Sequence, residues 1–567
     1  MIKQNLFSVS SVCLTFVLLS GCDSSSSGPM SVAVSCEAAL PNESDQQAYL
    51  QLGGPFDSLQ HVSGVKMTRM IDNEIRKRMC DEEIAGLGLG LVWHGNLVYV
   101  KGYGWARGFP RASDSSPQVM VRGQRTRFRW ASVSKTVTGL AASIAAQEVF
   151  PDGSPLFDLD SELTPSYRGC DGQGQNCIFS PPGAYHTNWD EEDDESDWSN
   201  VFLLSLTSAD EPITIRMLLA NRSGTMHYGQ YDPGWANSGV PSESAKSLNE
   251  GFGWAVDQFT SNPLLFLPGT RYNYSSFGFN MAGTALDVVT TPVIGGFWPY
   301  VAQRVASKTQ PSPMVFFHPD DLYDPQYQSA PWFTSGNRAS GYYRDSDSNQ
   351  ILRRDPIGDV SWKLPGGGFI STVADMALYA HGLLNFRFLS EARSDDMWTP
   401  QASIITGEIG LNSGYALGFN VDINLGERRV AHNGRQQSAR TRLVLYPDGE
   451  DPSVGKLAIV LMSNSEYANL PAMADAIDEL LREPLIPDPT SELSILHQSG
   501  NPDGTSLSFV DGRGRVMSYL DPENDFLAAP SFRVPTEHTY NFSLDRSRQV
   551  PSPDPDMGRR DDLGEAP

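Results

Sequence analysis

The residue pair best suited to chemistry is a serine three positions before a lysine, Ser132 and Lys135, where a run of small residues predicts a helix. Positions i and i+3 of a helix lie on one face, with Cβ atoms roughly 5–6 Å apart, so the amine can reach the serine oxygen. A serine hydroxyl is nearly inert at neutral pH, but an amine that loses its proton on burial can accept the hydroxyl proton. The spacing therefore predicts a nucleophile with its own base, beside the first-turn N–H groups that stabilise negative charge.

The spacing recurs twice elsewhere in the chain, at Ser63/Lys66 and at Ser453/Lys456. The first pair opens an expected helix over residues 64–79, where a serine is more often an N-cap. The second pair lies in an expected turn before a strand-like run. Only Ser132 follows an aromatic segment, with Phe128 and Trp130, and leads into an apolar helix, so Ser132 is the candidate nucleophile.

A serine–lysine enzyme needs another proton-handling group and a strand whose backbone can support an oxyanion. Two downstream segments supply candidates. PGTRYNYSSFGFNMAG contains Tyr274 and Ser276, and VAHNGRQQS contains His432 and Gly434.

Together these segments resemble the serine β-lactamase and penicillin-binding-protein superfamily, and specifically its class C-like branch. That branch includes class C β-lactamases, D-alanyl-D-alanine carboxypeptidases, D-aminopeptidases and β-lactamase-like esterases. The resemblance runs from about residue 86 to residue 464 and follows the family's motif order. The matching segments are residues 128–135, ITIRMLLANRSG at 213–224, residues 268–278, residues 365–375, YALGF at 415–419 and HNG at 432–434.

The resemblance implies a role for each candidate. Ser132 would be acylated, Lys135 would help to deprotonate it, and Tyr274 would relay protons; how lysine and tyrosine divide the work of the base is disputed for the family. The backbone N–H groups of Ser132 and Arg435, next to Gly434, would form the oxyanion hole. The implied fold is α+β, a three-layer α/β/α arrangement with an antiparallel sheet and a helical insertion subdomain, with no metal and no cofactor.

Two positions depart from the family pattern. Ser276 replaces an asparagine, and a hydroxyl offers less reach and fewer donors than a carboxamide, so we expect relaxed selection for a substrate amide. His432 stands where β-lactamases carry a lysine, and histidine is mostly neutral above about pH 6.5. We therefore expect a weaker grip on a substrate carboxylate, because strand alternation places the Arg435 side chain on the face opposite His432.

Composition and the N-terminus indicate an exported protein. The formal net charge of −25 argues against nucleic acid and against an anionic membrane surface as main partners. Lys3, an apolar stretch over residues 6–19 and the sequence LSGC predict a bacterial lipoprotein signal, with Cys22 as the lipidated first residue. The expected location is a bacterial membrane, facing the periplasm or the cell exterior. The acidic run DEEDDESD at 190–197 predicts a solvated loop, with a calcium site as the alternative.

Four cysteines remain after removal of Cys13 and modification of Cys22, and an even number in an exported protein suggests disulfides. Three pairings are possible. We favour Cys36 with Cys80, and Cys170 with Cys177, since the second pair would close one loop. Their scattered spacing and the lack of paired histidines argue against zinc.

The expected organisation is a signal peptide (1–21), a tether (22–45), a hydrolase domain (46–484), a small extension (485–547) and a disordered tail (548–567). Insertions are expected at about 165–205, as a surface loop, and at 309–360, as an irregular stretch that would cover the site. Expected elements are two strands over 86–102, a short helix at 213–220, a turn and helix over 363–385, an antiparallel meander over 415–464 and a hairpin around 511–514.

The predicted function is a serine hydrolase, an esterase or peptidase acting on a small acyl or D-amino-acid-type substrate. A β-lactamase or D,D-carboxypeptidase is the alternative within this class. The alternative from another class is a non-catalytic scaffolding or peptidoglycan-binding lipoprotein. The expected partners are small ester, amide or peptidoglycan-type molecules, with membrane contact through the N-terminal lipid only.

Overall fold

The structure is a computed structural model. It describes residues 36–43, 67–150, 153–163, 184–187, 202–205, 212–227, 256, 263–309, 318–319, 337–354, 361–402, 413–452, 454–482, 494–501, 504–510 and 516–520.

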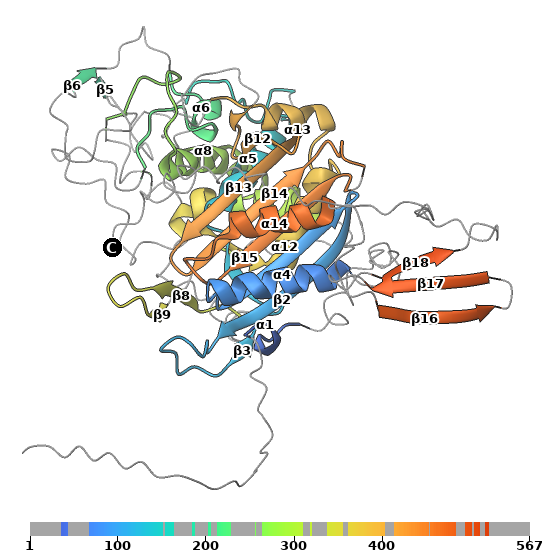
Figure 1. The fold of residues 1–567 in the computed structure, drawn as a ribbon. Coiled ribbons are helices and arrows are strands. Elements are labelled where there is room, and N and C mark those ends of the chain that lie inside the picture. Colours follow the sequence, from blue (N-terminus) through green and yellow to red (C-terminus); the bar gives the residue numbers. More distant parts are fainter. Residues whose placement is uncertain are drawn as a thin grey trace, which may run out of the picture.

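An eight-stranded sheet forms the centre of the molecule, in the order β11-β12-β13-β14-β15-β1-β2-β3 (Figure 1). The pairs that the structure defines in it are antiparallel, and β1 near the start of the domain pairs with β15 near its end. The strands are β1 (Gly86–Trp93), β2 (Asn96–Arg107), β3 (Val119–Met120), β11 (Gly414–Tyr415), β12 (Asn420–Asn424), β13 (Glu427–Gln436), β14 (Ala439–Tyr446) and β15 (Leu457–Ser463).

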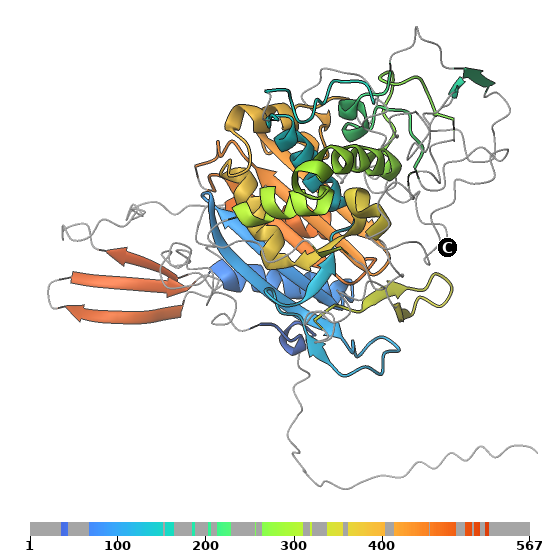
Figure 2. The same cartoon turned by 180° about the vertical axis from the view of Figure 1, so that it is seen from behind.

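Helices cover both faces of this sheet. On one face lie α4 (Met67–Asp81) and α14 (Leu470–Arg482), in front of the sheet in Figure 1. On the other face lie α5 (Ser134–Ala145), α8 (Ser276–Ile294) and α12 (Val373–Leu384), which come to the front in Figure 2. The predicted α+β architecture with an antiparallel sheet between helices is therefore confirmed.

Smaller elements complete the description. The helices are α1 (Cys36–Ala39), α6 (Ile215–Leu219), α9 (Phe297–Arg304) and α13 (Glu391–Trp398), with short helical turns η1 (Ala131–Val133), η3 (Ala306–Lys308), η4 (Ser361–Lys363) and η5 (Leu364–Gly368). A three-stranded sheet has the order β4-β10-β7, from β4 (Arg127–Arg129), β10 (Phe369–Thr372) and β7 (His318–Pro319). Antiparallel pairs join β5 (Ala184–Thr187) to β6 (Phe202–Ser205) and β8 (Gly341–Arg344) to β9 (Ile351–Arg354).

The sequence of β1, GLGLGLVW, explains how the two helical layers attach to one strand. Its alternate leucines, Leu87, Leu89 and Leu91, are buried in the cluster formed with α4 and α14. Two of its glycines face α12: a Cβ at Gly88 would lie 2.9 Å from a Val373 methyl, and one at Gly90 would lie 2.6 Å from the Ala377 Cβ. Because side chains alternate across a strand, leucine fills one interface and glycine lets a helix approach closely at the other.

Several sequence expectations can be compared with these elements. The meander, the 86–102 strand pair and the helix after the glycine-rich turn all form. The 165–205 stretch, expected as a loop, also contains β5 and β6, and the 309–360 stretch contains the β8–β9 hairpin, so neither is wholly irregular. Near residues 511–514, β17 (Gly504–Val510) pairs with β18 (Val516–Leu520), and β16 (Ser494–Asn501) pairs with β17.

Other expectations fall outside the described residues, namely Cys22, Cys170, Cys177, the acidic run at 190–197, the first residues of the predicted 64–79 helix, and the tail. Within the part of the chain that the structure describes, no helix has the length and apolarity needed to cross a membrane.

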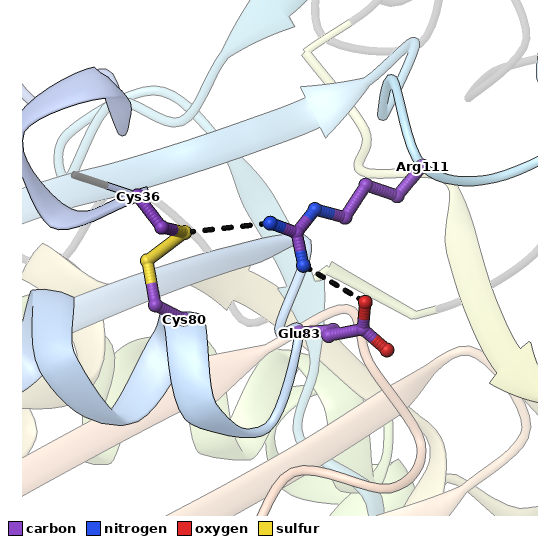
Figure 3. Close-up of a disulfide and its surroundings, with 4 residues drawn as sticks. All are labelled: Cys36, Cys80, Glu83 and Arg111. Atoms are coloured by element: carbon purple, nitrogen blue, oxygen red, sulfur yellow. Dashed lines mark hydrogen bonds and ion pairs between the residues drawn. A yellow bond between two sulfur atoms is a disulfide. The ribbon is translucent and has the colours of Figure 1, made fainter. Parts of the chain in front are cut away.

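One expected disulfide is present. Cys36 of α1 is bonded to Cys80 of α4, as Figure 3 shows. The Arg111 guanidinium lies beside this bond, 3.6 Å from the Cys36 sulfur, and donates to the Glu83 carboxylate at 2.8 Å. The bridge ties α1 to α4.

Candidate active site

The nucleophile candidate sits on a strained turn between a strand and a helix. Ser132 is half-buried in η1, which leads directly into α5. The preceding residue, Ala131, has a φ of +48°, a conformation that an L-residue adopts at a cost. Trp130 anchors this turn, since its N–H donates to Phe369 O at 2.8 Å and its indole N–H donates to Ser371 Oγ at 2.8 Å. Contacts with β10 therefore determine where Ser132 is presented.

Lys135 is fully buried and connects three parts of the site. Its Nζ atom lies 3.2 Å from Ser132 Oγ, 2.8 Å from Ser276 Oγ and 2.7 Å from Gly366 O. The same nitrogen lies 4.6 Å from the centre of the Tyr274 ring. The amine that the sequence places one helical turn from the serine thus contacts the serine oxygen.

Tyr274 precedes α8 and is held by a residue with a left-handed backbone. Asn221 has a φ of +56°, which asparagine tolerates better than most residues. Its carbonyl accepts the N–H of Asn273 at 2.9 Å, and its Oδ1 accepts the N–H of Ser275 at 2.9 Å. These two hydrogen bonds fix the backbone on both sides of Tyr274. The Ser275 hydroxyl then caps α8 by accepting from Gly278 N.

Strand β13 forms the wall opposite α8. Gly434 packs so closely against the nucleophile turn that a Cβ there would lie 2.4 Å from Trp130 O and 3.2 Å from the Ala131 Cβ. Thr441, which pairs with Gly434 across the sheet, donates its hydroxyl to Arg129 O at 3.0 Å. The backbone of β13 therefore runs beside Ser132, while the Arg435 side chain is exposed.

His432 is buried and uncharged. Its Nδ1 lies 2.6 Å from Asn433 O, a pure acceptor, so Nδ1 carries the proton and Nε2 accepts from the Tyr415 hydroxyl at 2.9 Å. Burial, followed by the positive charges of Lys135 and Arg442, lowers the pKa of His432 to about 3, against the hydrogen bond to Asn433. The family's permanent cation is thus replaced by a neutral ring that packs near Tyr274.

A second histidine, His227, lies at the same site. Its Nδ1 accepts the backbone N–H of Ser276 at 3.1 Å, and its ring meets the Tyr274 ring edge-on at 5.2 Å. Burial, then the charges of Lys135 and Lys363, hold the pKa of His227 well below its usual value.

The structure thus brings together most of the residues singled out from the sequence. Ser132, Lys135, Tyr274 and Ser276 contact one another directly or through Lys135, and His432 with Gly434 lines the adjoining strand. Sequence reasoning did not single out Asn221 and His227. Asn221 occupies the position of the histidine in the family's LLxHxSG pattern, and that departure was the available signal. His227 had none.

In the described part of the chain, no group of three or more His, Cys, Asp or Glu side chains is placed to hold a metal ion.

A family model described as Beta-lactamase matches residues 71–482, which is most of the chain. A penicillin-binding protein homologue from Pyrococcus abyssi is similar in structure, with a TM-score of 0.51 at 16% identity, covering 79% of this chain and 89% of its own. A D-amino acid amidase from Ochrobactrum anthropi SV3 gives a TM-score of 0.49 at 15% identity, covering 74% of this chain and 99% of its own.

At these identities the structural likeness shows the fold alone, whereas the family model spans the strands, helices and turns that assemble the site. The chain therefore belongs to the β-lactamase family and has the serine-hydrolase fold of that family.

Proposed function

We propose that this protein hydrolyses small acyl compounds through an acyl-enzyme on Ser132, as an esterase or as a peptidase on D-amino-acid-type substrates. The observation that carries the proposal is the contact between Lys135 Nζ and Ser132 Oγ at 3.2 Å, within a buried cradle formed by Ser276 and Gly366. A buried amine in this position has a task that packing alone does not require.

The chemistry proceeds in two halves. Ser132 Oγ attacks the carbonyl carbon as its proton passes to a Tyr274 phenolate, or to Lys135 once that amine has released the proton it carries at rest. The resulting tetrahedral oxyanion collapses, the bond to the leaving group breaks, and the leaving oxygen or nitrogen takes up that proton. Water then attacks the ester on Ser132 with the same groups in reverse roles, which releases the acid and restores the serine.

The oxyanion would be stabilised by the backbone N–H groups of Ser132 and Arg435. Support comes from the close approach of β13 to the nucleophile turn at Gly434, the residue before Arg435. Donors fixed in this way cost no reorganisation during the reaction, and one such donor contributes roughly 10²–10³ to the rate in known enzymes.

The identity of residues 276 and 432 supports a preference for substrates without a carboxylate. His432 has a pKa of about 3 and is neutral throughout the physiological range. The Ser276 hydroxyl is buried and already contacts Lys135 at 2.8 Å, so it is poorly placed to bind a substrate amide as well. A short ester needs neither interaction.

The test compares two chromogenic substrates. We expect kcat/KM for p-nitrophenyl acetate or butyrate to exceed that for nitrocefin at least about tenfold, a difference of roughly 1.4 kcal/mol in transition-state stabilisation. The double variant Ser276→Asn/His432→Lys should narrow this difference. Efficient nitrocefin turnover with little ester cleavage would instead make the protein a β-lactamase, and a burst of acylation that then stalls would indicate penicillin-binding behaviour.

Location is a separate proposal. We infer from the LSGC sequence that Cys22 carries a lipid and anchors the protein to a bacterial membrane. Cys22→Ser should then release the protein in soluble form, and an unlipidated native N-terminus would contradict the inference.

A further inference from the structure

We propose that His227 is a positioning residue of this catalytic centre: it holds the Tyr274 ring and the first turn of α8, so that Ser276 stays against Lys135. The proposal rests on the proposed function, because it assigns His227 a role in orienting the groups that handle the Ser132 proton. This positioning role goes beyond the proposed function, because His227 is not one of the serine, lysine and tyrosine that carry out the chemistry.

A hydrogen bond from the backbone of Ser276 ties the start of α8 to His227. Ser276 is the first residue of α8, and the N–H groups of a first helical turn have no partner within the helix. The Ser275 hydroxyl accepts one of them, from Gly278. His227 Nδ1 accepts the one from Ser276, at 3.1 Å. The imidazole therefore fixes the backbone of the residue whose side chain contacts Lys135 at 2.8 Å.

The ring of His227 also packs against the ring of Tyr274. The two rings meet at 89°, with their centres 5.2 Å apart, which is a favourable edge-to-face arrangement. His227 thus contacts both Tyr274 and Ser276. The centre of the Tyr274 ring lies 4.6 Å from Lys135 Nζ, and the Ser276 hydroxyl contacts the same nitrogen. One side chain fixes two of the groups that surround the amine.

The surrounding charges keep His227 in the form that this role requires. Burial opposes protonation of the imidazole most, Lys135 on α5 and Lys363 at the end of η4 oppose it further, and Tyr274 is a titratable group packed on its ring. A protonated imidazole has no acceptor and would lose the Ser276 hydrogen bond. Because Nδ1 is occupied by a peptide N–H, that nitrogen is not available as a base for Ser132.

The test uses two variants of His227 that distinguish the effect of its Nδ1 acceptor from the effect of its ring packing. His227→Phe keeps an aromatic ring but removes the acceptor, whereas His227→Asn keeps an acceptor near the position of Nδ1. His94→Asn is the matched control, since His94 is exposed in the β1–β2 turn with a φ of +49° that asparagine tolerates. Steady-state hydrolysis of p-nitrophenyl butyrate and the rate of fluorophosphonate labelling at Ser132 are measured for each variant.

We expect His227→Phe to lower kcat and the labelling rate about tenfold or more, the effect of one lost hydrogen bond at a reacting centre, with KM within about twofold. His227→Asn should recover most of that loss, and His94→Asn should match the wild type. Equal losses in both His227 variants would overturn the proposal, because ring packing alone would then explain them. So would wild-type kcat in His227→Phe. If His227→Phe does not fold, failure of His227→Asn to sustain labelling decides against the acceptor role. A wild-type protein that is not labelled at Ser132 would refute the proposed function instead.

Discussion

At the scale of single residues, the site depends on burying one amine among oxygen atoms. Lys135 contacts Ser132 Oγ, Ser276 Oγ and Gly366 O, and it has no measurable exposure to solvent. A hydroxyl and a carbonyl can both accept from the amine, so these contacts direct the lysine at the serine.

The buried imidazole of His432 should make the free energy of unfolding depend on pH. Its pKa is about 3 in the folded protein and near the ordinary value of about 6.5 when unfolded, so the unfolded chain binds an extra proton between these values. The contribution of the neutral His432 ring to the free energy of unfolding is present above pH 6.5 and is lost as the pH falls toward 3. At pH 4.5 the loss amounts to about 3 kcal/mol.

His432→Gln removes this titration while retaining an acceptor for Tyr415 and a donor for Asn433 O. Its free energy of unfolding should therefore fall less than that of the wild type between pH 7 and pH 4.5, measured by urea denaturation at each pH. The His94→Asn variant should behave as the wild type. Identical pH dependence in His432→Gln and the wild type would show that His432 titrates normally.

Residue types and spacing predicted the reactive part of the site but not its supports. The i, i+3 spacing is enough to bring Lys135 to Ser132, because a helix fixes that geometry locally. Asn221 and His227 act through a left-handed turn and a contact across 49 residues of sequence, and no local pattern encodes either. The proximity of His432 to Tyr274 was available only through resemblance to a family.

At the scale of elements, period-two patterns determine most of the sheet. Alternating leucine and glycine in β1, and the strand pattern over residues 415–464, predicted strands that the structure contains. In β15 the apolar run is continuous, and all of its residues are buried. The β5–β6 and β8–β9 pairs lie in stretches rich in glycine, proline or aromatic residues, where four-residue strands carry too few positions to show a period. Tertiary contacts decide such elements: Tyr342 of β8, for example, donates to Asp114 at 2.6 Å.

The β1–α12 contact gives a prediction at this scale. Gly90→Ala places a Cβ 2.6 Å from the Ala377 Cβ, so α12 must shift, and overpacking of this kind costs typically about 1–3 kcal/mol. Ala377→Gly alone should cost about 1 kcal/mol through helix propensity. In the double variant the clash is removed, so its loss of unfolding free energy should be smaller than the sum of the two single losses. Simple additivity in thermal or urea unfolding would mean that the two residues do not meet.

At the scale of the whole molecule, the fold is closed by pairings that are distant in sequence. Leu87 pairs with Ser463 across β1 and β15, and Cys36 is bonded to Cys80. Strand alternation cannot identify such partners; the resemblance to a known family supplied the arrangement of layers, and cysteine parity suggested the bond. The favoured Cys36–Cys80 pairing was one of three possibilities, and the structure selects it.

Removing the disulfide should affect stability but not catalysis. The bond joins residues separated by 44 positions, for which loss of chain entropy in the unfolded state gives an upper value of about 4 kcal/mol. Cys36→Ser/Cys80→Ser should therefore lower the free energy of unfolding by roughly 2–4 kcal/mol, while kcat/KM for the ester substrate at 25 °C stays within about twofold. A large loss of activity in a fully folded variant would show that the α1–α4 region is coupled to the site.

Covalent labelling tests whether Ser132 is the nucleophile and Lys135 its assisting base. The full-length protein is treated with a fluorophosphonate, the rate of modification is followed by intact mass, and the modified residue is located by peptide mapping. We expect one label per chain on Ser132, none in Ser132→Ala, and labelling slowed about 10²–10⁴-fold in Lys135→Ala. A label on another residue, or undiminished labelling and ester hydrolysis in Ser132→Ala, would contradict this assignment.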